Sequence, residues 1–250
     1  MGFFDLDDPL LNFNFISSSK AFSRQQGSML QWDYLGNTHS INFNNFLNKT
    51  YKNISIDIHD QSIISEFDFP IYCLSNDYNF GLSCNFFQLA RKRPGYGIEN
   101  MQSEIKMNPN KDGVWLINRL SGKKELIASY EYMLQDLPCS FSDNCYINHL
   151  SFSPDDKTVV WFLIKEVKYG REIYFQGMRL DDQRKIFNIE SKRLISHFCW
   201  IDPNTILGTN RDSSLNWNYS KYNIINNSRS DLKINSGFDG HPMFNVSSNK

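Results

Sequence analysis

Three histidines stand next to segments whose composition is typical of β-strands, and their side chains could do chemistry together. They are His149 in "NHLSFSPDDK", His197 in "SHFCWIDPN" and His241 in "DGHPMF". Neutral imidazoles bind Mn, Fe, Ni, Cu or Zn, and three protein ligands with an open coordination position are typical of a Lewis-acid site. If the three segments are equivalent strands of a repeated fold, the imidazoles meet at one rim. The sequence therefore favours a metal site made by these residues, with hydrogen bonding at the rim as the alternative role.

Two glutamines, Gln25 and Gln26, precede a glycine and an apolar strand in "SRQQGSMLQW". A glutamine amide oxygen can complete the ligand shell of a metal or bind a sugar hydroxyl. We expect one of the two amides to contact substrate at the rim that carries the histidines. The alternative is that both amides hold a loop in place.

The densest basic cluster lies in "ARKRPGYGIE" and contains Arg91 and Arg93, and Tyr96 follows it. The proline and glycines around Tyr96 predict an ordered turn. Arginine binds carboxylates through two parallel hydrogen bonds, and a tyrosine face stacks on sugar rings, so an acidic saccharide is the expected ligand. A solvated loop with incidental charges is the alternative.

Two further charged residues could support such a site. Arg211, in "GTNRDSS", follows the second strand of the segment that contains His197, and it could bind an anion. Asp239 stands two residues before His241, where a carboxylate could orient that imidazole.

The expected scaffold is all-β, because short alternating or apolar runs are separated by Asn, Asp, Gly, Pro and Ser. Helix-like composition occurs only at 125–134 and, weakly, at 101–106. The clearest strand candidates are residues 40–46, 53–60, 112–120, 157–164, 171–180 and 221–227.

A repeat organises these strands into four-stranded antiparallel blades. Similar units begin at residues 29, 71, 149, 197 and 241, and three of the four spacings match the 40 to 50 residues of propeller repeats. The long interval before residue 149 requires an insertion, which 86–111 and 130–145 can supply. The sequence thus predicts one β-propeller domain over 1–250, with about four full blades and a partial blade at each end, compatible with a fragment of a seven-bladed ring. Equivalent positions of successive blades then converge at one rim.

Composition narrows the class of partner. The net charge is −1, with 26 basic and 27 acidic residues, which disfavours nucleic acid and anionic membranes as partners. No apolar run approaches the ~18 residues that a membrane span needs. The five cysteines are odd in number and form no C-x-x-C pair, so we expect reduced thiols and a cytoplasmic protein. P-loop, Rossmann and G-x-S-x-G patterns do not occur, which leaves nucleotide use and serine hydrolysis without support.

The motifs "QQGSMLQW", "RPGYG", "NHLSFSPDDKTVVWF" and "DGHPMF" together resemble the oligogalacturonate lyase-like and TolB/WD40-like β-propellers of bacteria, over roughly residues 23–245. In the lyase family, three histidines and one glutamine hold manganese, and short uronate oligosaccharides are cleaved by β-elimination. The resemblance implies that His149, His197 and His241 are the metal ligands. It does not fix the glutamine, because Gln25 and Gln26 precede a different blade and no glutamine stands shortly before His197.

Two functions of different classes follow. The first is a saccharide-binding propeller that acts as a metal-dependent lyase, in which Arg93 or Arg211 stabilises the enolate-like charge that develops beside the substrate carboxylate. The sequence does not identify the base that removes the C5 proton. The second is a non-catalytic scaffold that binds a protein or a glycan, with the histidines as hydrogen-bonding residues at the rim.

Overall fold

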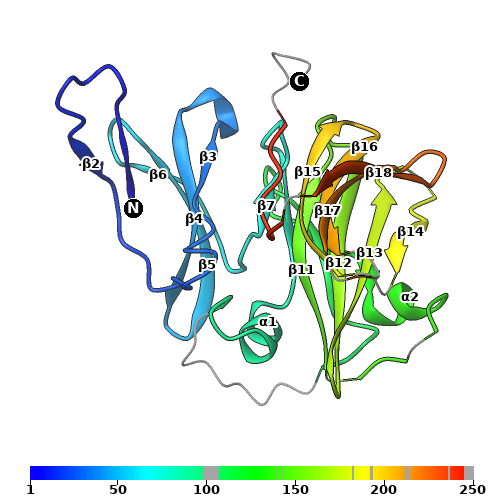
Figure 1. The fold of residues 1–250 in the computed structure, drawn as a ribbon. Helices are drawn as coiled ribbons and strands as arrows, with labels where there is room; N and C mark the ends of the chain where they lie inside the picture. Colours follow the sequence, from blue (N-terminus) through cyan, green and yellow to red (C-terminus); the bar gives the residue numbers. More distant parts are fainter. Residues whose placement is uncertain are drawn as a thin grey trace. The chain divides into compact units, whose positions relative to one another are not determined.

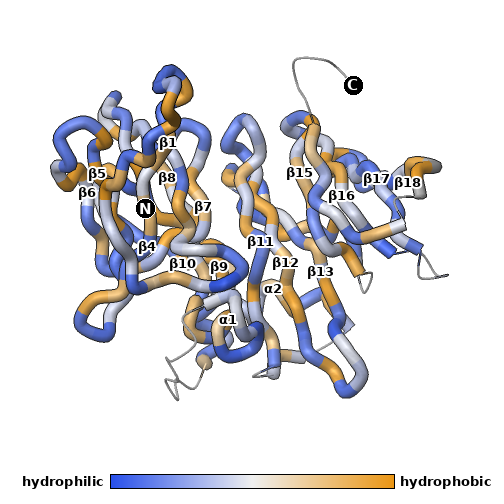
Figure 2. Tube along the Cα trace, turned by 60° about the vertical axis from the view of Figure 1, so that its left-hand side comes forward, coloured by the Kyte–Doolittle hydropathy of each residue, from blue (hydrophilic) through white to orange (hydrophobic). Residues whose placement is uncertain are grey.

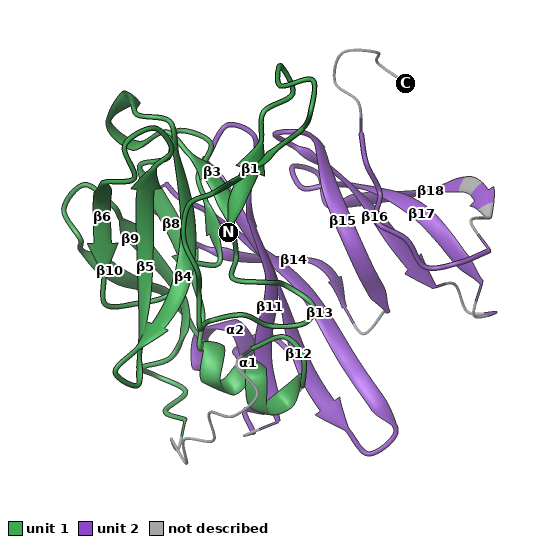
Figure 3. Cartoon of the chain, turned by 90° about the vertical axis from the view of Figure 1, so that its left-hand side faces the viewer, with its two compact units in different colours: residues 1–129 green, residues 130–250 purple. Residues whose placement is uncertain are grey.

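The chain divides into two compact units, Met1–Ser129 (unit 1) and Tyr130–Lys250 (unit 2), which Figure 3 shows in two colours. The computed structural model describes residues 1–97, 107–138, 140–142, 144–181, 183–191, 194–211, 214, 216–235 and 237–244. The expectation of one domain over 1–250 stays a prediction.

Unit 1 contains a short two-stranded sheet and two blades (Figure 1). The short sheet pairs β1 (Gly2–Phe4) with β2 (Phe13–Phe15). Blade 1 consists of β3 (Gln31–Asp33), β4 (Ser40–Leu47), β5 (Thr50–Asp57) and β6 (Ile63–Phe67). Blade 2 consists of β7 (Cys73–Leu74), β8 (Phe80–Ser83), β9 (Gly113–Asn118) and β10 (Lys124–Ser129). A 3-10 helix (Leu35–Asn37) joins β3 to β4, and α1 (Phe86–Lys92) lies in the long connection from β8 to β9.

Unit 2 begins with α2 (Tyr130–Leu134) and contains two more blades. Blade 3 consists of β11 (Cys145–Phe152), β12 (Thr158–Val167), β13 (Gly170–Arg179) and β14 (Ile186–Ser191). Blade 4 consists of β15 (Ile195–Asp202), β16 (Thr205–Arg211), β17 (Trp217–Asn223) and β18 (Ser228–Asn235). All four blades are antiparallel sheets in sequence order, so the predicted all-β propeller fold of four-stranded blades is confirmed.

The turn between the first two strands is the same in blades 2 and 3, which confirms the repeat in atomic detail. Ser75 Oγ donates to Asp77 Oδ1 at 2.6 Å, and Ser153 Oγ donates to Asp155 Oδ1 at 2.7 Å. Each serine Oγ also accepts the backbone N–H of the first residue of the next strand, at 2.9 Å in β8 and 3.0 Å in β12. The "LSNDYNF" and "FSPDDKT" sequences therefore make one type of Asx-stabilised turn.

The structure corrects two predicted elements. Residues 125–134 are not one helix, because Lys124–Ser129 forms β10 and the helix is confined to Tyr130–Leu134. Pairing with the edge of β9 satisfies the backbone of β10 and overrides its helical composition. The strand expected at 221–227 ends at Asn223, whose side chain accepts the N–H groups of Ile225 and Asn226 and turns the chain. The weak helix predicted at 101–106 lies outside the described residues.

The core of unit 2 is aromatic. Trp161 and Phe162 of β12 and Phe175 of β13 are at most 1% exposed. Phe175 lies with its ring centroid 4.9 Å from that of Phe162 and 4.9 Å from that of Phe198 in β15, so the rings join blades 3 and 4. The first seven residues of β12 are buried, and Figure 2 shows the hydrophobic colour along this strand. A strand buried on both faces reads as a continuous apolar run, as "TVVWFLI" does.

The interior of blade 1 combines an apolar cluster, which includes Phe43 and Ile54, with a buried polar network. Arg119, just after β9, makes a two-pronged ion pair with Asp33 of β3, at 2.9 Å and 2.5 Å, and both side chains are fully buried. Ser55 Oγ donates to the same carboxylate at 2.7 Å. Asn53 and Asn42 exchange side-chain hydrogen bonds of 2.8 Å and 2.9 Å beside this pair. Arg119 thereby links blade 2 to blade 1, whereas the serine and asparagine contacts lie within blade 1.

Four described cysteines, Cys73, Cys84, Cys145 and Cys199, are free thiols, and Cys139 lies outside the described residues. Cys84 in unit 1 and Cys145 in unit 2 are buried. Burial, with smaller contributions from Asp112 and Cys73, raises the pKa of the Cys84 thiol well above its usual value. Within the described ranges, no helix has the length and apolar character that crossing a membrane requires.

Candidate functional site

The three histidines singled out in the sequence gather in unit 2. The ring centroid of His197 lies 3.7 Å from that of His241 and 5.8 Å from that of His149. His149 comes from blade 3, His197 from blade 4, and His241 from the segment after β18. Thr209 of β16 holds this last segment by donating its hydroxyl to the Gly240 carbonyl at 2.8 Å. We call the three residues the histidine cluster.

Bulged strands present two members of the cluster. Asn148 pairs with Phe162 and Ser151 pairs with Val160, so the two residues between them, His149 and Leu150, face one residue of β12. His149 has a φ of 53°, which is uncommon for a residue with a side chain. β15 has a similar register shift immediately before His197. Bulges re-aim side chains and are frequent beside functional sites, which makes this shared irregularity a second mark of the cluster.

The structure places His149 within a strand rather than at its start. β11 begins at Cys145, four residues earlier, because "CYIN" continues the apolar strand and pairs with β12. The bulge, and not the strand end, therefore brings this imidazole toward the other two.

Asp239 contacts His197, whereas the sequence suggested His241 as its partner. His197 Nδ1 lies 3.3 Å from Asp239 Oδ1 and 2.6 Å from Ser196 Oγ, and Ser196 also donates to Asp239. The chain bends at residues 237 and 238, and Asp239 contacts Ser196 and His197 at the start of β15. Serine and carboxylate contact the same ring nitrogen, so these residues are not a nucleophile–base–orienter relay, which uses both nitrogens. Nε2 is the ring atom of His197 left for a ligand.

The surroundings of His197 favour its neutral form. Burial is the main cause that lowers the pKa of this imidazole, and the neighbouring His241 lowers it further, against the opposing effect of Asp239. Neutral imidazole is the form that binds a metal or accepts a hydrogen bond.

Arg211 belongs to the same unit and extends from the same strand pair. His197 pairs with Thr209, and residues two apart on a strand share a face, so Arg211 lies on the face of β16 that carries Thr209. Its guanidinium lies 4.6 Å from the ring centroid of Trp217, and its Nε is buried with no hydrogen-bond partner among the described residues. A buried, unsatisfied N–H is costly unless a ligand or solvent pairs with it.

The remaining predicted residues, Gln25, Gln26, Arg91, Arg93 and Tyr96, lie together in unit 1. The Gln25 N–H donates to the Gly95 carbonyl at 2.9 Å, which ties the glutamine pair to the "RPGYG" loop. The side-chain amide of Gln26 donates to the Tyr72 hydroxyl at 2.6 Å. Gly95 has a φ of 91°, the conformation that this turn requires of a glycine.

The arginines of this loop already have partners. Arg91 donates to the Gln88 side chain at 2.6 Å. The guanidinium carbon of Arg93 lies 4.9 Å from the ring centroid of Tyr96 and uses one face of the ring. The five residues therefore belong to unit 1, whereas the three histidines and Arg211 belong to unit 2.

The donor chemistry of the histidine cluster fits a transition metal, because it consists of imidazoles of which one has its pKa lowered by burial. No group of three or more His, Cys, Asp or Glu side chains is placed to hold a metal ion in the parts of the chain that the structure describes. Metal binding accordingly belongs to the proposal below.

Sequence reasoning missed Ser196 and Thr209, which position the cluster. Their partners lie 43 and 31 residues away along the chain, and small hydroxyl residues are common in strands. The only local signal was the "SH" pair at the start of a strand.

Comparison with solved structures supports the fold. A puromycin-hydrolyzing peptidase of Mycobacterium tuberculosis superposes with a TM-score of 0.52 at 12% identity, over 89% of this chain and 34% of that one. Oligogalacturonate lyase from Vibrio parahaemolyticus gives a TM-score of 0.51 at 13% identity, over 92% of this chain and 58% of that one. An oligogalacturonate lyase in complex with manganese gives 0.52 at 10% identity, over 92% and 60%.

These similarities define what the chain shares with known proteins. No family model and no curated protein matches its sequence. The chain spans about a third of the peptidase, from the 34% coverage, and about three fifths of the lyases, from 58% and 60%. At such low identity the likeness concerns the fold alone, and at that level it confirms the resemblance to oligogalacturonate lyase-like β-propellers.

Proposed function

We propose that this protein binds a small acidic saccharide at the histidine cluster and, with a divalent transition metal, cleaves short uronate oligosaccharides by β-elimination. The observation that carries the proposal is the meeting of His149, His197 and His241, from two blades and a third segment, with centroid distances of 3.7 Å and 5.8 Å. These residues are 44 and 48 positions apart in the sequence, and their convergence is the support for a shared role.

The three imidazoles are the residues that would hold the metal, with Nε2 as the donor atom of His197. When bound, manganese or a similar ion supplies a Lewis acid for the substrate carboxylate. A solved structure of similar fold is that of an oligogalacturonate lyase in complex with manganese, which supports the choice of this metal for the first test.

Other residues of unit 2 have roles that follow from their contacts. Asp239 and Ser196 are positioning residues, because both contact Nδ1 of His197 and fix the orientation of its ring. Arg211 offers a buried, unsatisfied N–H on the face beside the cluster, where it would bind the negative charge that develops when the proton next to the carboxylate leaves.

The unit 1 residues enter the proposal as a saccharide-binding loop. Gln25, Gln26, Arg91, Arg93 and Tyr96 combine amides, guanidinium groups and an aromatic face, which are the groups that bind hydroxyls, carboxylates and sugar rings. Arg93 would bind a carboxylate of the saccharide at this loop.

The first experiment measures metal bound to untagged protein after dialysis against manganese, together with binding and cleavage of galacturonate oligosaccharides. We expect near-stoichiometric manganese in the wild type and its loss in His197→Ala, with loss of the unsaturated product that absorbs in the ultraviolet. His59→Ala is the matched control, because His59 is exposed and lies in unit 1. Circular dichroism confirms that each variant is folded.

Two outcomes would contradict this proposal. Folded wild type without metal and without cleavage, but with saturable oligosaccharide binding that His197→Ala removes, would replace the lyase with a non-catalytic glycan-binding scaffold. Binding and cleavage that survive alanine at all three histidines would exclude the cluster as the site.

A further inference from the structure

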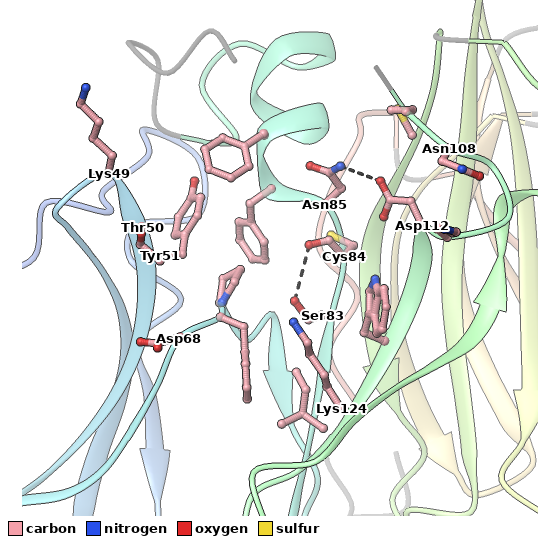
Figure 4. Close-up of a pocket in the computed structure, with 18 residues that line it drawn as sticks. Lys49, Thr50, Tyr51, Asp68, Ser83, Cys84, Asn85, Asn108, Asp112 and Lys124 are labelled. Atoms are coloured by element: carbon pink, nitrogen blue, oxygen red, sulfur yellow. Dashed lines mark hydrogen bonds between the residues drawn. The ribbon is translucent and has the colours of Figure 1, made fainter. Parts of the chain in front are cut away.

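A second site of different chemistry lies wholly within unit 1. A pocket of about 460 Å³ is formed by blade 1, blade 2 and α1. Figure 4 shows Lys49, Thr50 and Tyr51 on one side of it and Asn85 and Asp112 on the other. The volume is within the range of small-molecule sites. None of the residues discussed for the histidine cluster lines it, so it requires its own explanation. We call it the aromatic pocket.

Aromatic rings form much of its wall. Tyr51 packs edge-on against Phe87, with ring centroids 5.2 Å apart, and lies 5.5 Å from the centroid of Phe86. Trp115 of β9 and Phe69 also line the pocket and are partly exposed to it. Half-exposed rings that face a cavity are suited to stacking on a flat ligand.

Asp112 is the half-buried acidic group of this pocket. Its Oδ2 accepts the side-chain amide of Asn85 at 2.6 Å, its Oδ1 accepts the Gly113 N–H at 2.8 Å, and the Trp115 side chain donates to the carboxyl group. Burial raises the pKa of Asp112, against the effect of these three hydrogen bonds. A carboxylate has about four acceptor positions, so one remains for a donor on a ligand. Among the described residues, no basic side chain makes an ion pair with it.

Lysines supply positive charge around the same pocket. The Lys124 ammonium lies 5.8 Å from the ring centroid of Trp115 and 5.9 Å from that of Phe69. Lys49 and Lys111 also line the pocket, and all three lysines are exposed. A ligand stacked on Trp115 would therefore meet the half-buried Asp112 acceptor at the indole N–H edge and the Lys124 ammonium group near the ring.

We propose that the aromatic pocket binds a nucleoside monophosphate whose base carries an exocyclic amino group. The base stacks on Trp115, the amino group donates to the remaining acceptor position of Asp112, and the phosphate binds Lys124 and the neighbouring lysines. A flat base suits walls made of aromatic rings, and one donor edge with an anionic tail suits a pocket lined by both Asp112 and lysines. The absence of a glycine-rich phosphate loop is compatible with this mode, because ammonium groups take the phosphate.

Calorimetric titration of the full chain with AMP, IMP and adenosine tests each contact. AMP presents an exocyclic amino group and an unprotonated N1, whereas IMP presents a carbonyl oxygen and an N1–H. Because the proposed contact is made by the exocyclic amino group, AMP is expected to bind about tenfold more tightly. Asp112→Asn should reverse or abolish that preference, because an amide can donate to the carbonyl of IMP. Trp115→Leu should weaken AMP binding by about tenfold or more through lost stacking. Lys124→Met should weaken AMP but not adenosine, and Lys123→Met is the matched control, an adjacent exposed lysine that does not line the pocket.

The results that would overturn the proposal are distinct from failure of the lyase. Folded wild type that shows no saturable AMP binding, or equal affinity for AMP and IMP that Asp112→Asn leaves unchanged, would refute it. Saturable galacturonate binding that Trp115→Leu removes, without AMP binding, would assign the pocket to a saccharide instead. The histidine variants are expected to leave AMP binding unchanged, since they belong to the other unit.

Discussion

Blade 1 in unit 1 and blade 3 in unit 2 share the same strand order, but blade 1 buries a polar network beside its apolar cluster, whereas blade 3 buries large aromatic side chains. Among the largest fully buried side chains, the aromatic ones belong to unit 2, with the exception of Phe43. The described residues contain one buried pair of opposite charges, Asp33 and Arg119, and it lies in unit 1. The same architecture therefore tolerates two kinds of interior.

The difference teaches where specificity and stability come from in each unit. An aromatic core is stabilised by burial and packing, which tolerate apolar substitutions of similar volume. A polar interior leaves unsatisfied groups in every arrangement but one, so it defines the register of blade 1 against blade 2. When one partner in a polar interior is removed, the buried groups that bonded to it are left unsatisfied, which lowers the free energy of unfolding.

The largest expected effect comes from breaking the buried ion pair. Arg119→Met leaves the Asp33 carboxylate buried without its cation, which should lower the free energy of unfolding by about 3–5 kcal/mol. Urea denaturation followed by circular dichroism measures this loss. The double variant Arg119→Met with Asp33→Leu removes both charges and should recover most of the stability. A double variant as unstable as the single one would show that apolar residues cannot replace this network.

A smaller effect is expected from buried amides, and it should differ between the units. Asn53→Leu removes hydrogen bonds to Asn42, Asn44 and the Phe43 carbonyl, while Gln176→Leu in β13 removes bonds to Trp161, Asn188 and the Met133 carbonyl. Each buried group left unsatisfied costs about 1–3 kcal/mol.

Because Asn53 bonds to two other buried asparagines, its replacement should be the more destabilising of the two. Hydrogen exchange of peptides from blade 1 and blade 3 locates each loss. Equal losses would mean that the polar interior of unit 1 has no special sensitivity.

The matched turns should respond alike, despite the different cores beneath them. Ser75→Ala and Ser153→Ala each remove a hydroxyl that donates to an aspartate and accepts a backbone N–H. We expect each to cost about 1 kcal/mol. The same denaturation experiment serves here, and a difference between the two variants of more than about 1 kcal/mol would contradict the equivalence of the turns.

The smallest expected effect is a dependence on acid pH. Burial raises the pKa of Asp77 and of Asp155, but hydrogen bonds from the turn outweigh it and lower both values below 3.8. A carboxyl whose pKa is lowered in the folded state stabilises that state above its unfolded pKa, and the contribution is lost as pH falls through the folded value. Asp77→Asn and Asp155→Asn should therefore flatten the loss of stability below about pH 4. If the free energy of unfolding falls with pH at the same slope in the wild type and in both variants, these turns do not contribute to the acid sensitivity.

The sequence predicted the blades well because each strand and turn is a local signal. Alternating or apolar runs identified β4, β5, β9, β12 and β13, and the Ser-x-Asp turns marked blades 2 and 3. The convergence of the histidines was also predictable, since a repeat places equivalent residues together. The sequence did not predict which residue each buried polar side chain contacts. Arg119 is 86 residues from Asp33 and Asp239 is 42 residues from His197, and nothing local connects such pairs.

The two inaccessible thiols have a practical consequence. Cys84 follows β8 of blade 2 and Cys145 begins β11 of blade 3, and a buried thiol reacts slowly with alkylating reagents until its surroundings open. Among the described residues, each unit thus carries a buried native probe, without any engineered label. The rates at which the two cysteines become modified in native buffer would report separately how often each half of the molecule opens.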